Sequence, residues 1–295
     1  MIPRDYMLKA LDASGGVKII LAASTRLAEN AHQRHGTSAT ASAVLGRVLT
    51  AALLMIHDVK DPSDVVSIRF NGDGPAGVII ATATGLGTVR GYISNPQADL
   101  PATPLGKLDV GGLIGREGYV EVVKDIGLKQ PFSGRVPLVS GEIAEDLVNY
   151  YLHSEQIPTL LALGVLVDVD LTVVSAGGLM VQALPGADEQ VVAQIERQVL
   201  DIGNISASLA EADSLEALLK RVMGSLEYQI IGEQDLEFCC TCNRERLAVI
   251  LSSYSREEIE RLCDDEGIVE ITCNFCNEQY RYTPQQIMNA KKPQP

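Results

Sequence analysis

The stretch FCCTCNRER at residues 238–246 and the stretch TCNFC at residues 272–276 contain five of the six cysteines of this 295-residue chain. Two close cysteine pairs about thirty residues apart can bring four thiolates to one tetrahedral zinc ion. Disulfides or buried apolar positions are the alternative roles for these side chains. All six cysteines are confined to residues 239–276, and five of them have the spacing of metal ligands. This pattern favours a metal site.

The second pair is defined by the C-x-x-C of Cys273 and Cys276, but the first pair can be chosen in two ways. Cys239 and Cys242 form another C-x-x-C, whereas Cys240 and Cys242 form C-x-C. In an extended segment positions i and i+2 point to the same side, which favours Cys240 with Cys242. A tight knuckle turn would instead admit Cys239, and the general zinc-ribbon pattern slightly favours C-x-x-C. The residues alone leave both choices open.

The chain is acidic, because 24 Lys and Arg against 38 Asp and Glu give a net charge of 24 − 38 = −14. No cluster of Lys or Arg offsets this charge, so phosphate backbones are repelled. Aromatic residues are few and Trp is absent, which disfavours a platform for base stacking. We therefore expect no nucleic-acid partner.

The N-terminal sequence MIPRDY lacks the pattern of a signal peptide, and the longest apolar run, residues 49–56, is far too short to span a bilayer. We expect a soluble, cytoplasmic protein with no membrane partner. A reducing cytosol keeps thiols free, which again favours a metal over structural disulfides.

Short runs of alternating or β-branched residues, separated by turn signals, predict an α+β fold with a mainly antiparallel sheet and packed helices. Helices are expected from Thr25, from a cap at Thr37 or Ser38, and from Ser140. Residues 97–118 are expected to form a loop with short strands, and Gly177-Gly178 is expected to separate two strands. The predicted strands are residues 17–22, 65–70, 78–83, 87–93, 119–123, 134–139, 163–167, 171–175, 179–184, 230–238 and 268–272.

The glycine-rich segment 71–77 matches G-x-G-x-x-G, the motif of dinucleotide-binding loops. Such a site requires a helix directly after the loop, so that the helix N-terminus meets the pyrophosphate. Here the apolar run 78–83 follows and predicts a strand. We interpret the segment as the turn of a β-hairpin.

The composition changes at Pro185-Gly186-Ala187-Asp188, after which two amphipathic helices are expected over about 188–203 and 213–226. We predict an N-terminal core domain (1–184), a helical linker (185–232) and a small C-terminal zinc-binding domain (233–295). The linker helices form either a fixed subdomain or a covering layer that can detach. Within the C-terminal domain, Ser255 and Glu258 are expected to form a capping box at the start of a helix. Cys263 is expected to be a small core residue, and the tail at 291–293 is expected to be disordered.

Several motifs together closely resemble the bacterial thirty-three-kilodalton heat-shock protein family, which consists of redox-regulated holdase chaperones. The resemblance covers nearly the whole chain, and the extra Cys239 is a departure from it. The family pattern selects Cys240 over Cys239. The matching segments are QRHGT (33–37), ASAVLGR (41–47), GDGPAG (72–77), YISNP (92–96), VSGE (139–142), SEQIP (154–158), CTCNRER (240–246) and CNFCNE (273–278).

The resemblance implies a non-enzymatic protein that is inactive when reduced, with one zinc ion per chain bound by Cys240, Cys242, Cys273 and Cys276. It implies that peroxide or hypochlorite, with heat, forms the disulfides Cys240–Cys242 and Cys273–Cys276 and expels the zinc. The linker helices then unfold, and the protein, as a homodimer, binds unfolding client proteins without ATP to prevent their aggregation.

Simple chemistry agrees with this implied mechanism. Thiolates can be oxidised, and a disulfide between i and i+2 closes a small, strained ring that is readily reduced again. A structural zinc contributes about 10–16 kcal/mol, whereas a core as small as this terminal domain supplies about 3–5 kcal/mol. Loss of zinc should therefore unfold the C-terminal domain. The competing hypotheses are a zinc-ribbon interaction module and a C-x-x-C thiol–disulfide oxidoreductase.

Overall fold

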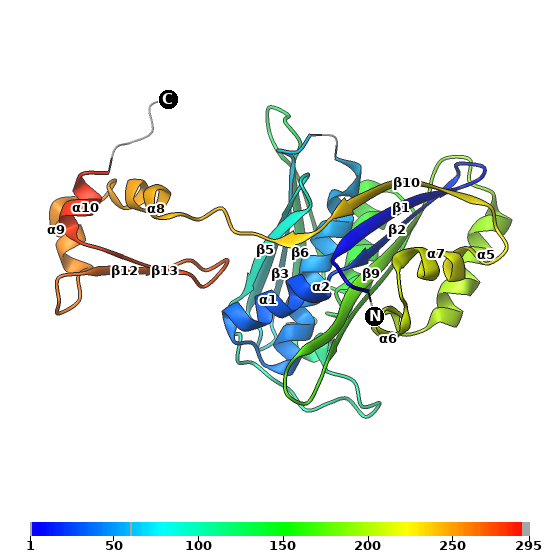
Figure 1. The fold of residues 1–295 in the computed structure, drawn as a ribbon, viewed down its shortest axis with the longest axis horizontal. Coiled ribbons are helices and arrows are strands. Elements are labelled where there is room, and N and C mark those ends of the chain that lie inside the picture. The colour runs from blue at the N-terminus through cyan, green and yellow to red at the C-terminus, as the bar shows by residue number, and fades with distance from the viewer. Residues whose placement is uncertain (1, 60, 291–295) are drawn as a thin grey trace. The chain divides into compact units, whose positions relative to one another are not determined.

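The computed structural model describes residues 2–59 and 61–290. It divides into two compact units, Met1–Phe238 and Cys239–Pro295, which we call the core unit and the C-terminal unit (Figure 1). The model confirms the predicted α+β class with mainly antiparallel sheets. The expected disorder at 291–293 lies outside the described residues.

The first sheet of the core unit has five antiparallel strands, and its first and last strands in sequence lie side by side. The last strand in sequence, β10, pairs with the first, β1, so that Tyr6 lies opposite Asp235. In spatial order the strands are β10 (Tyr228–Asp235), β1 (Tyr6–Asp12), β2 (Val17–Ala23), β9 (Val173–Ala183) and β8 (Thr159–Val167).

The second sheet has six strands, of which five pair in antiparallel fashion while β11 pairs in parallel with β5. The glycine-rich segment 71–77 joins β3 to β4 as a hairpin, which confirms the prediction. In spatial order the strands are β11 (Glu237–Phe238), β5 (Thr88–Ile93), β4 (Val78–Thr84), β3 (Val65–Gly72), β6 (Gly118–Asp125) and β7 (Phe132–Pro137).

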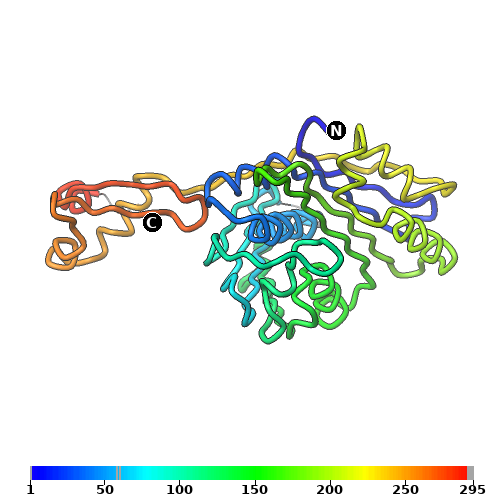
Figure 2. Tube along the Cα trace, turned by 90° about the horizontal axis from the view of Figure 1, so that it is seen from below, coloured from blue at the N-terminus to red at the C-terminus, as the bar shows by residue number. Residues whose placement is uncertain are grey.

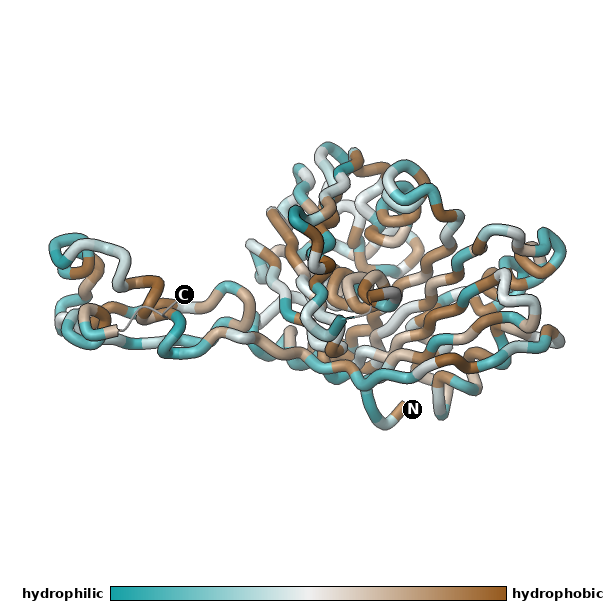
Figure 3. The backbone as a smooth tube through the Cα atoms, turned by 90° about the horizontal axis from the view of Figure 1, so that it is seen from above, coloured by the Kyte–Doolittle hydropathy of each residue, from teal (hydrophilic) through white to brown (hydrophobic). Residues whose placement is uncertain are grey.

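Helix α2 (Ala39–Met55) lies between the two sheets and contacts β8 and β9 on one side and β4 and β5 on the other (Figure 2). All its residues are buried except Ala39 and Arg47. A helix that is apolar around its whole circumference is stable only inside a core. Figure 3 shows hydrophobic residues concentrated in this interior. Ser38 caps the helix by accepting a hydrogen bond from the N–H of Ala41.

Helix α1 (Thr25–His35) precedes α2 and ends at Gly36, whose φ of 59° is the left-handed conformation that favours glycine. The core unit also contains several short helical segments. They are the 3₁₀ turn η1 (Ile56–Asp58), α3 (Val110–Ile114), α4 (Ala144–Tyr150) and the π-helical turn η2 (Tyr151–Glu155).

Three helices cover the other face of the five-stranded sheet: α5 (Glu189–Ile202), α6 (Ile205–Glu211) and α7 (Leu215–Met223) (Figure 1). Their apolar side chains share one buried cluster with β1, β2 and β9. The helices contribute Ile195, Val199, Ile205, Leu209, Leu215, Leu218, Leu219, Val222 and Met223 to this cluster.

Tyr6 connects α7 to the first strand. The N–H of Leu215, at the start of α7, donates to the Tyr6 hydroxyl oxygen at 2.7 Å, and that hydroxyl donates to Oε2 of Glu216 at 3.0 Å. Burial raises the pKa of Tyr6 to about 12, so the hydroxyl remains a neutral donor at physiological pH. One side chain of β1 thus satisfies an otherwise unpaired N–H at the helix N-terminus.

Some expectations for the core unit were wrong. Gly177-Gly178 does not separate two strands but lies inside β9, because the neighbouring strand and helix approach too closely for a side chain. A Cβ at Gly177 would lie 2.2 Å from the backbone oxygen of Ala22 and 2.5 Å from Cδ1 of Leu209. Residues 97–118 contain helix α3 and the start of β6 rather than several short strands, because Asp109 caps the helix through the N–H of Gly112.

Two further differences concern the sequence after α5. Asn204 does not simply end that helix but caps the unpredicted helix α6, by accepting from the N–H groups of Ser206 and Ala207. The predicted strand 230–238 is divided into β10 and β11, which pair with different sheets of the core unit.

The C-terminal unit consists of a short hairpin and three helices around a small apolar cluster formed by Ala248, Leu251, Ile259, Val269, Tyr282 and Ile287. Ser255 forms the predicted capping box with Glu258, which confirms the start of α9. The elements are α8 (Arg244–Leu251), α9 (Arg256–Arg261), β12 (Val269–Thr272), β13 (Gln279–Tyr282) and α10 (Pro284–Met288).

Among the described residues, no helix combines the length and the apolar character that crossing a membrane requires.

Replacing Tyr6 by Phe should lower the free energy of unfolding of the core unit by about 1–3 kcal/mol, because the buried N–H of Leu215 loses its acceptor. Urea unfolding followed by circular dichroism measures the change. Tyr254→Phe is the control, since Tyr254 is 49% exposed, and it should change the value by less than about 0.5 kcal/mol. Equal effects of the two substitutions would contradict the role assigned to Tyr6.

Candidate metal centre

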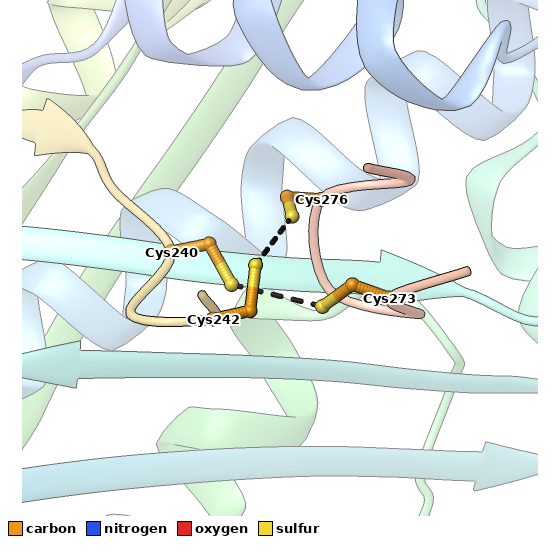
Figure 4. A group of neighbouring side chains, drawn as sticks. All are labelled: Cys240, Cys242, Cys273 and Cys276. Carbon is orange, nitrogen blue, oxygen red and sulfur yellow. Dashed lines mark hydrogen bonds between the residues drawn. The ribbon is translucent and has the colours of Figure 1, made fainter. Parts of the chain in front are cut away.

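The structure brings Cys240, Cys242, Cys273 and Cys276 together, with their four Sγ atoms all within 4.8 Å of one another (Figure 4). Cys240 and Cys242 lie in the segment between β11 and α8, and the other two lie in the turn between β12 and β13. The Sγ atoms of Cys240 and Cys273 are 3.8 Å apart, and those of Cys242 and Cys276 are 3.3 Å apart. The segment between β11 and α8 and the β12–β13 turn are therefore in contact through their cysteine sulfurs.

The turn that contains Cys273 and Cys276 is closed by backbone hydrogen bonds. The N–H of Cys273 donates to the carbonyl of Glu278 at 2.9 Å, and the carbonyl of Cys273 accepts from the N–H groups of Cys276 (3.3 Å) and Asn277 (2.8 Å). Asn277 has a φ of 58°, a left-handed conformation that Asn adopts more readily than most residues. This geometry fixes both cysteines at the tip of the hairpin.

The first cysteine segment is attached to the same hairpin through Arg244. Its guanidinium lies 4.7 Å from the ring centroid of Tyr282 and donates to the carbonyl of Arg281. In return, the Tyr282 hydroxyl donates to the carbonyl of Arg244 at 2.9 Å. Asn243 caps α8 by accepting from the N–H of Arg246 at 2.7 Å. The helix therefore begins directly after Cys242, at a position that the hairpin defines.

The remaining two cysteines lie outside the sulfur cluster. Cys239, the alternative first ligand, is exposed, whereas Cys240 is in the cluster. Cys263 is partly buried against the apolar cluster of the C-terminal unit, and its Sγ donates to the carbonyl of Ile259 at 3.4 Å.

The thiols of the cluster differ in their electrostatics. Burial alone would raise the pKa of Cys240, but hydrogen bonds from the backbone and side chain of Cys242 outweigh burial and lower it. The pKa values of Cys273 and Cys276 are raised, mainly by burial, and the charge of Cys240 contributes to the rise at Cys273. Ionised thiols this close repel one another, so all four can ionise together only beside a cation.

The donor set fits a metal ion. Four sulfurs at about 2.3 Å from a tetrahedral ion would lie about 3.8 Å from one another, which is close to the spacing observed. The set contains only sulfur, and thiolate ligands select zinc, copper(I) or iron–sulfur clusters over magnesium or calcium. These four cysteines could therefore hold a metal ion, and they are consistent with zinc.

Sequence reasoning missed Tyr280, which lies on β13. Its hydroxyl is 3.2 Å from Sγ of Cys242, and this hydrogen bond is the main cause of the raised pKa of Tyr280. When Cys242 is a thiolate its sulfur carries no proton, so the hydroxyl is the donor. The sequence pattern that could have identified Tyr280 is the alternation along a short strand next to the turn with Cys273 and Cys276. This alternation predicts which side of the strand Tyr280 lies on, but it does not predict the contact with Cys242.

Cys276 is followed directly by strand β13. A C-x-x-C oxidoreductase has its reactive cysteine at a helix N-terminus, which lowers the thiol pKa. The C-x-x-C of Cys273 and Cys276 lacks this arrangement.

Comparisons with known proteins agree over nearly the whole chain. A family model described as "Hsp33 protein" matches residues 5–283. The chain is 42% identical over 289 residues to the 33 kDa chaperonin of Desulforamulus reducens, covering 98% of both chains. It is 38% identical over 287 residues to the 33 kDa chaperonin of Enterococcus faecalis, covering 97% of this chain and 96% of that protein.

A solved structure is also similar. The crystal structure of the 33 kDa chaperonin (heat shock protein 33 homolog) from Thermotoga maritima superposes with a TM-score of 0.89 at 35% sequence identity, covering 97% of each chain.

Cys240→Ser should abolish metal binding, because three sulfurs leave one position of the site without a thiolate, whereas Cys239→Ser should retain one metal ion per chain. Elemental analysis of the purified, reduced proteins measures both. The opposite result would assign the first ligand to Cys239.

Proposed function

Because the chain belongs to the Hsp33 family of chaperones, which are not enzymes, we propose that it is a redox-regulated holdase that binds unfolding proteins without ATP. The observation that supports this proposal most directly is the convergence of four thiols in a unit with very little apolar core. Such a site can couple the oxidation state of the cysteines to the stability of the unit.

In the reduced form, Cys240, Cys242, Cys273 and Cys276 bind one zinc ion per chain. A zinc ion supplies a charge that offsets the repulsion of the thiolates, and it joins the segment before α8 to the β12–β13 hairpin. The chain's own contacts between these parts are few, with Arg244 and Tyr282 prominent among them.

Oxidation converts the four thiols into the disulfides Cys240–Cys242 and Cys273–Cys276. For each disulfide, a thiolate attacks one oxygen of hydrogen peroxide, the O–O bond breaks, and a sulfenic acid forms as hydroxide leaves. The paired thiolate then attacks that sulfur and displaces a second hydroxide. Each disulfide consumes one peroxide and yields two water molecules after protonation. A disulfide sulfur is no longer a thiolate, so the ligand set is lost.

The C-terminal unit depends on these ligands for its fold. Its apolar cluster contains six buried residues, and a small core of this kind supplies only a few kcal/mol, whereas structural zinc contributes about 10–16 kcal/mol. Loss of the ligand set therefore unfolds the unit.

The functional domains in this proposal are the core domain (1–184), the linker (185–232) and the C-terminal domain (233–295). Unfolding spreads from the C-terminal domain through β10 into the linker, because α7 is followed directly by β10 in the chain. Release of α5–α7 exposes their apolar faces and the sheet face beneath them. These surfaces bind unfolded clients in the cytoplasm, and the oxidised form is a homodimer without nucleic-acid or membrane partners.

Light scattering of a heat-denatured client protein tests the switch. The peroxide-treated protein should suppress aggregation without ATP, whereas the reduced, metal-loaded protein should not, because its apolar faces are covered. Equal protection by both forms would reject the redox switch, and protection by neither would reject the holdase.

Leu219→Glu should give partial activity without oxidant, because a charge placed at a site that is 1% exposed loosens α7 from the sheet. Aggregation suppression and protease cleavage within 185–232 are the measurements. Leu200→Glu is the control, since Leu200 is 77% exposed, and it should leave the reduced form inactive and protected. A reduced Leu219→Glu protein that is equally inactive and protected would show that these helices are a fixed subdomain.

A further inference from the structure

We propose that Tyr280 is a positioning residue for the redox switch, whose hydroxyl restrains the oxidation of Cys242 by donating a hydrogen bond to its sulfur. This inference rests on the proposed function, because it concerns the rate at which the same cysteines are oxidised. It assigns a role to a side chain that is neither a ligand nor part of the cysteine motifs.

Each sulfur of the cluster accepts a hydrogen bond from a group that is not a thiol. Cys240 accepts from the backbone N–H of Cys242, Cys273 from that of Phe275, and Cys276 from that of Glu278. Within the described part of the chain, the corresponding donor to Cys242 is the Tyr280 hydroxyl, at 3.2 Å. Three of the four donors are backbone groups, which a change of side chain other than to proline leaves in place, whereas the fourth is a side chain.

The position of Tyr280 is fixed by its surroundings. It lies on β13 directly opposite Ile271 of β12, and both side chains pack against the apolar cluster of the C-terminal unit. The ring cannot turn away without losing these contacts, so its hydroxyl stays beside Cys242. On the other side, Cys242 has Sγ of Cys276 at 3.3 Å. The hydroxyl and the neighbouring thiol thus flank the same sulfur.

A hydrogen bond withdraws electron density from a thiolate and makes it a weaker nucleophile toward peroxide. The oxidation step is otherwise unchanged: the sulfur attacks one peroxide oxygen, the O–O bond breaks, and hydroxide leaves. The paired thiolate then completes the disulfide and displaces a second hydroxide, so two thiolates lose two electrons and one peroxide gains them. The same hydrogen bond spreads the negative charge that four thiolates concentrate around a divalent ion, and so strengthens metal binding.

Magnitudes follow from these two effects. A hydrogen bond to an ionised group stabilises that group by about 10- to 100-fold in an equilibrium constant. If about half of this stabilisation is lost when the sulfur attacks peroxide, the rate changes by about 3- to 10-fold. Loss of a hydrogen bond to a metal ligand typically weakens metal binding by about 10- to 100-fold.

The test compares the full-length, zinc-loaded, reduced protein with its Tyr280→Phe and Tyr254→Phe variants. Tyr254→Phe is the control, because it removes a hydroxyl from the same unit at a side chain that is 49% exposed and lies outside the sulfur cluster. The measurements are the rate of free-thiol loss in hydrogen peroxide, zinc affinity by competition with a chelator, and the sulfur-to-metal charge-transfer absorption of the cobalt(II)-loaded proteins.

For Tyr280→Phe we expect about 3- to 10-fold faster thiol loss, about 10- to 100-fold weaker zinc binding, and a charge-transfer band at longer wavelength. Tyr254→Phe should leave the rate and the band unchanged. The proposal is overturned if Tyr280→Phe behaves like the parent protein, if it is oxidised more slowly, or if both variants change equally, since equal changes would indicate general loosening of the unit.

A second variant avoids any loss of packing. Site-specific replacement of Tyr280 by 3-fluorotyrosine retains the ring and makes the hydroxyl a stronger donor, so thiol loss should slow and the band should move to shorter wavelength. An unchanged rate and band would overturn the proposal. These readouts do not involve client proteins. If oxidation failed to activate the chaperone, the proposed function would be rejected, while the effect of Tyr280 on the sulfur would still be decided.

Discussion

The mutual repulsion of four thiolates within 4.8 Å is the physical constraint on which the C-terminal unit depends. The side chains that position these sulfurs also form much of the unit, since the β12–β13 turn, the cap of α8 and the Arg244–Tyr282 contacts all converge on them. The six-residue apolar cluster is too small to hold such charges together by itself. Chemistry at the sulfurs and the folding of the unit are therefore one equilibrium.

The core unit is stabilised by a different kind of interaction. Its centre is α2, which is buried on every side between two sheets, and its opposite face is covered by α5–α7 through a continuous apolar cluster. Neither contact contains a cysteine, because all six cysteines lie within residues 239–276. Because the two units depend on different interactions, a change at the sulfurs can destabilise the C-terminal unit while the interior around α2 stays packed. The helices α5–α7 pack on the core unit, and the chain continues from α7 through β10 to the C-terminal unit.

The sequence predicted features whose signal is local. Cysteine spacing indicated Cys242, Cys273 and Cys276 but left Cys239 and Cys240 open, and the family resemblance selected Cys240, which the structure brings to the other three. Alternation and caps predicted the strands β3–β6 and the helices at Ser38, Asp188 and Ser255. Features decided by distant partners were missed. Gly177 was predicted to break a strand, because the sequence does not show that Ala22 and Leu209 pack against it and leave no room for a side chain. The residues of β10 were predicted to continue directly into the cysteine segment, because the sequence does not show their pairing with β1. The contact between Tyr280 and Cys242 could not be predicted, because the two residues are far apart in the sequence and meet only when the C-terminal unit is folded.

The pairing of β1 with β10 also determines when the core unit can form. Tyr6 of β1 lies opposite Asp235 of β10, and β2 pairs with β9. Each of the first two strands made during synthesis therefore has one neighbouring strand that is made much later. Pairings over such long sequence separations make folding slow, because the chain must close large loops before it gains any contact. Until α7 has left the ribosome, the apolar sheet face that α5–α7 cover stays exposed, and β1 lacks its neighbour β10 until Asp235 has followed. The nascent chain is therefore for a time in the same condition as an unfolded protein that is liable to aggregate.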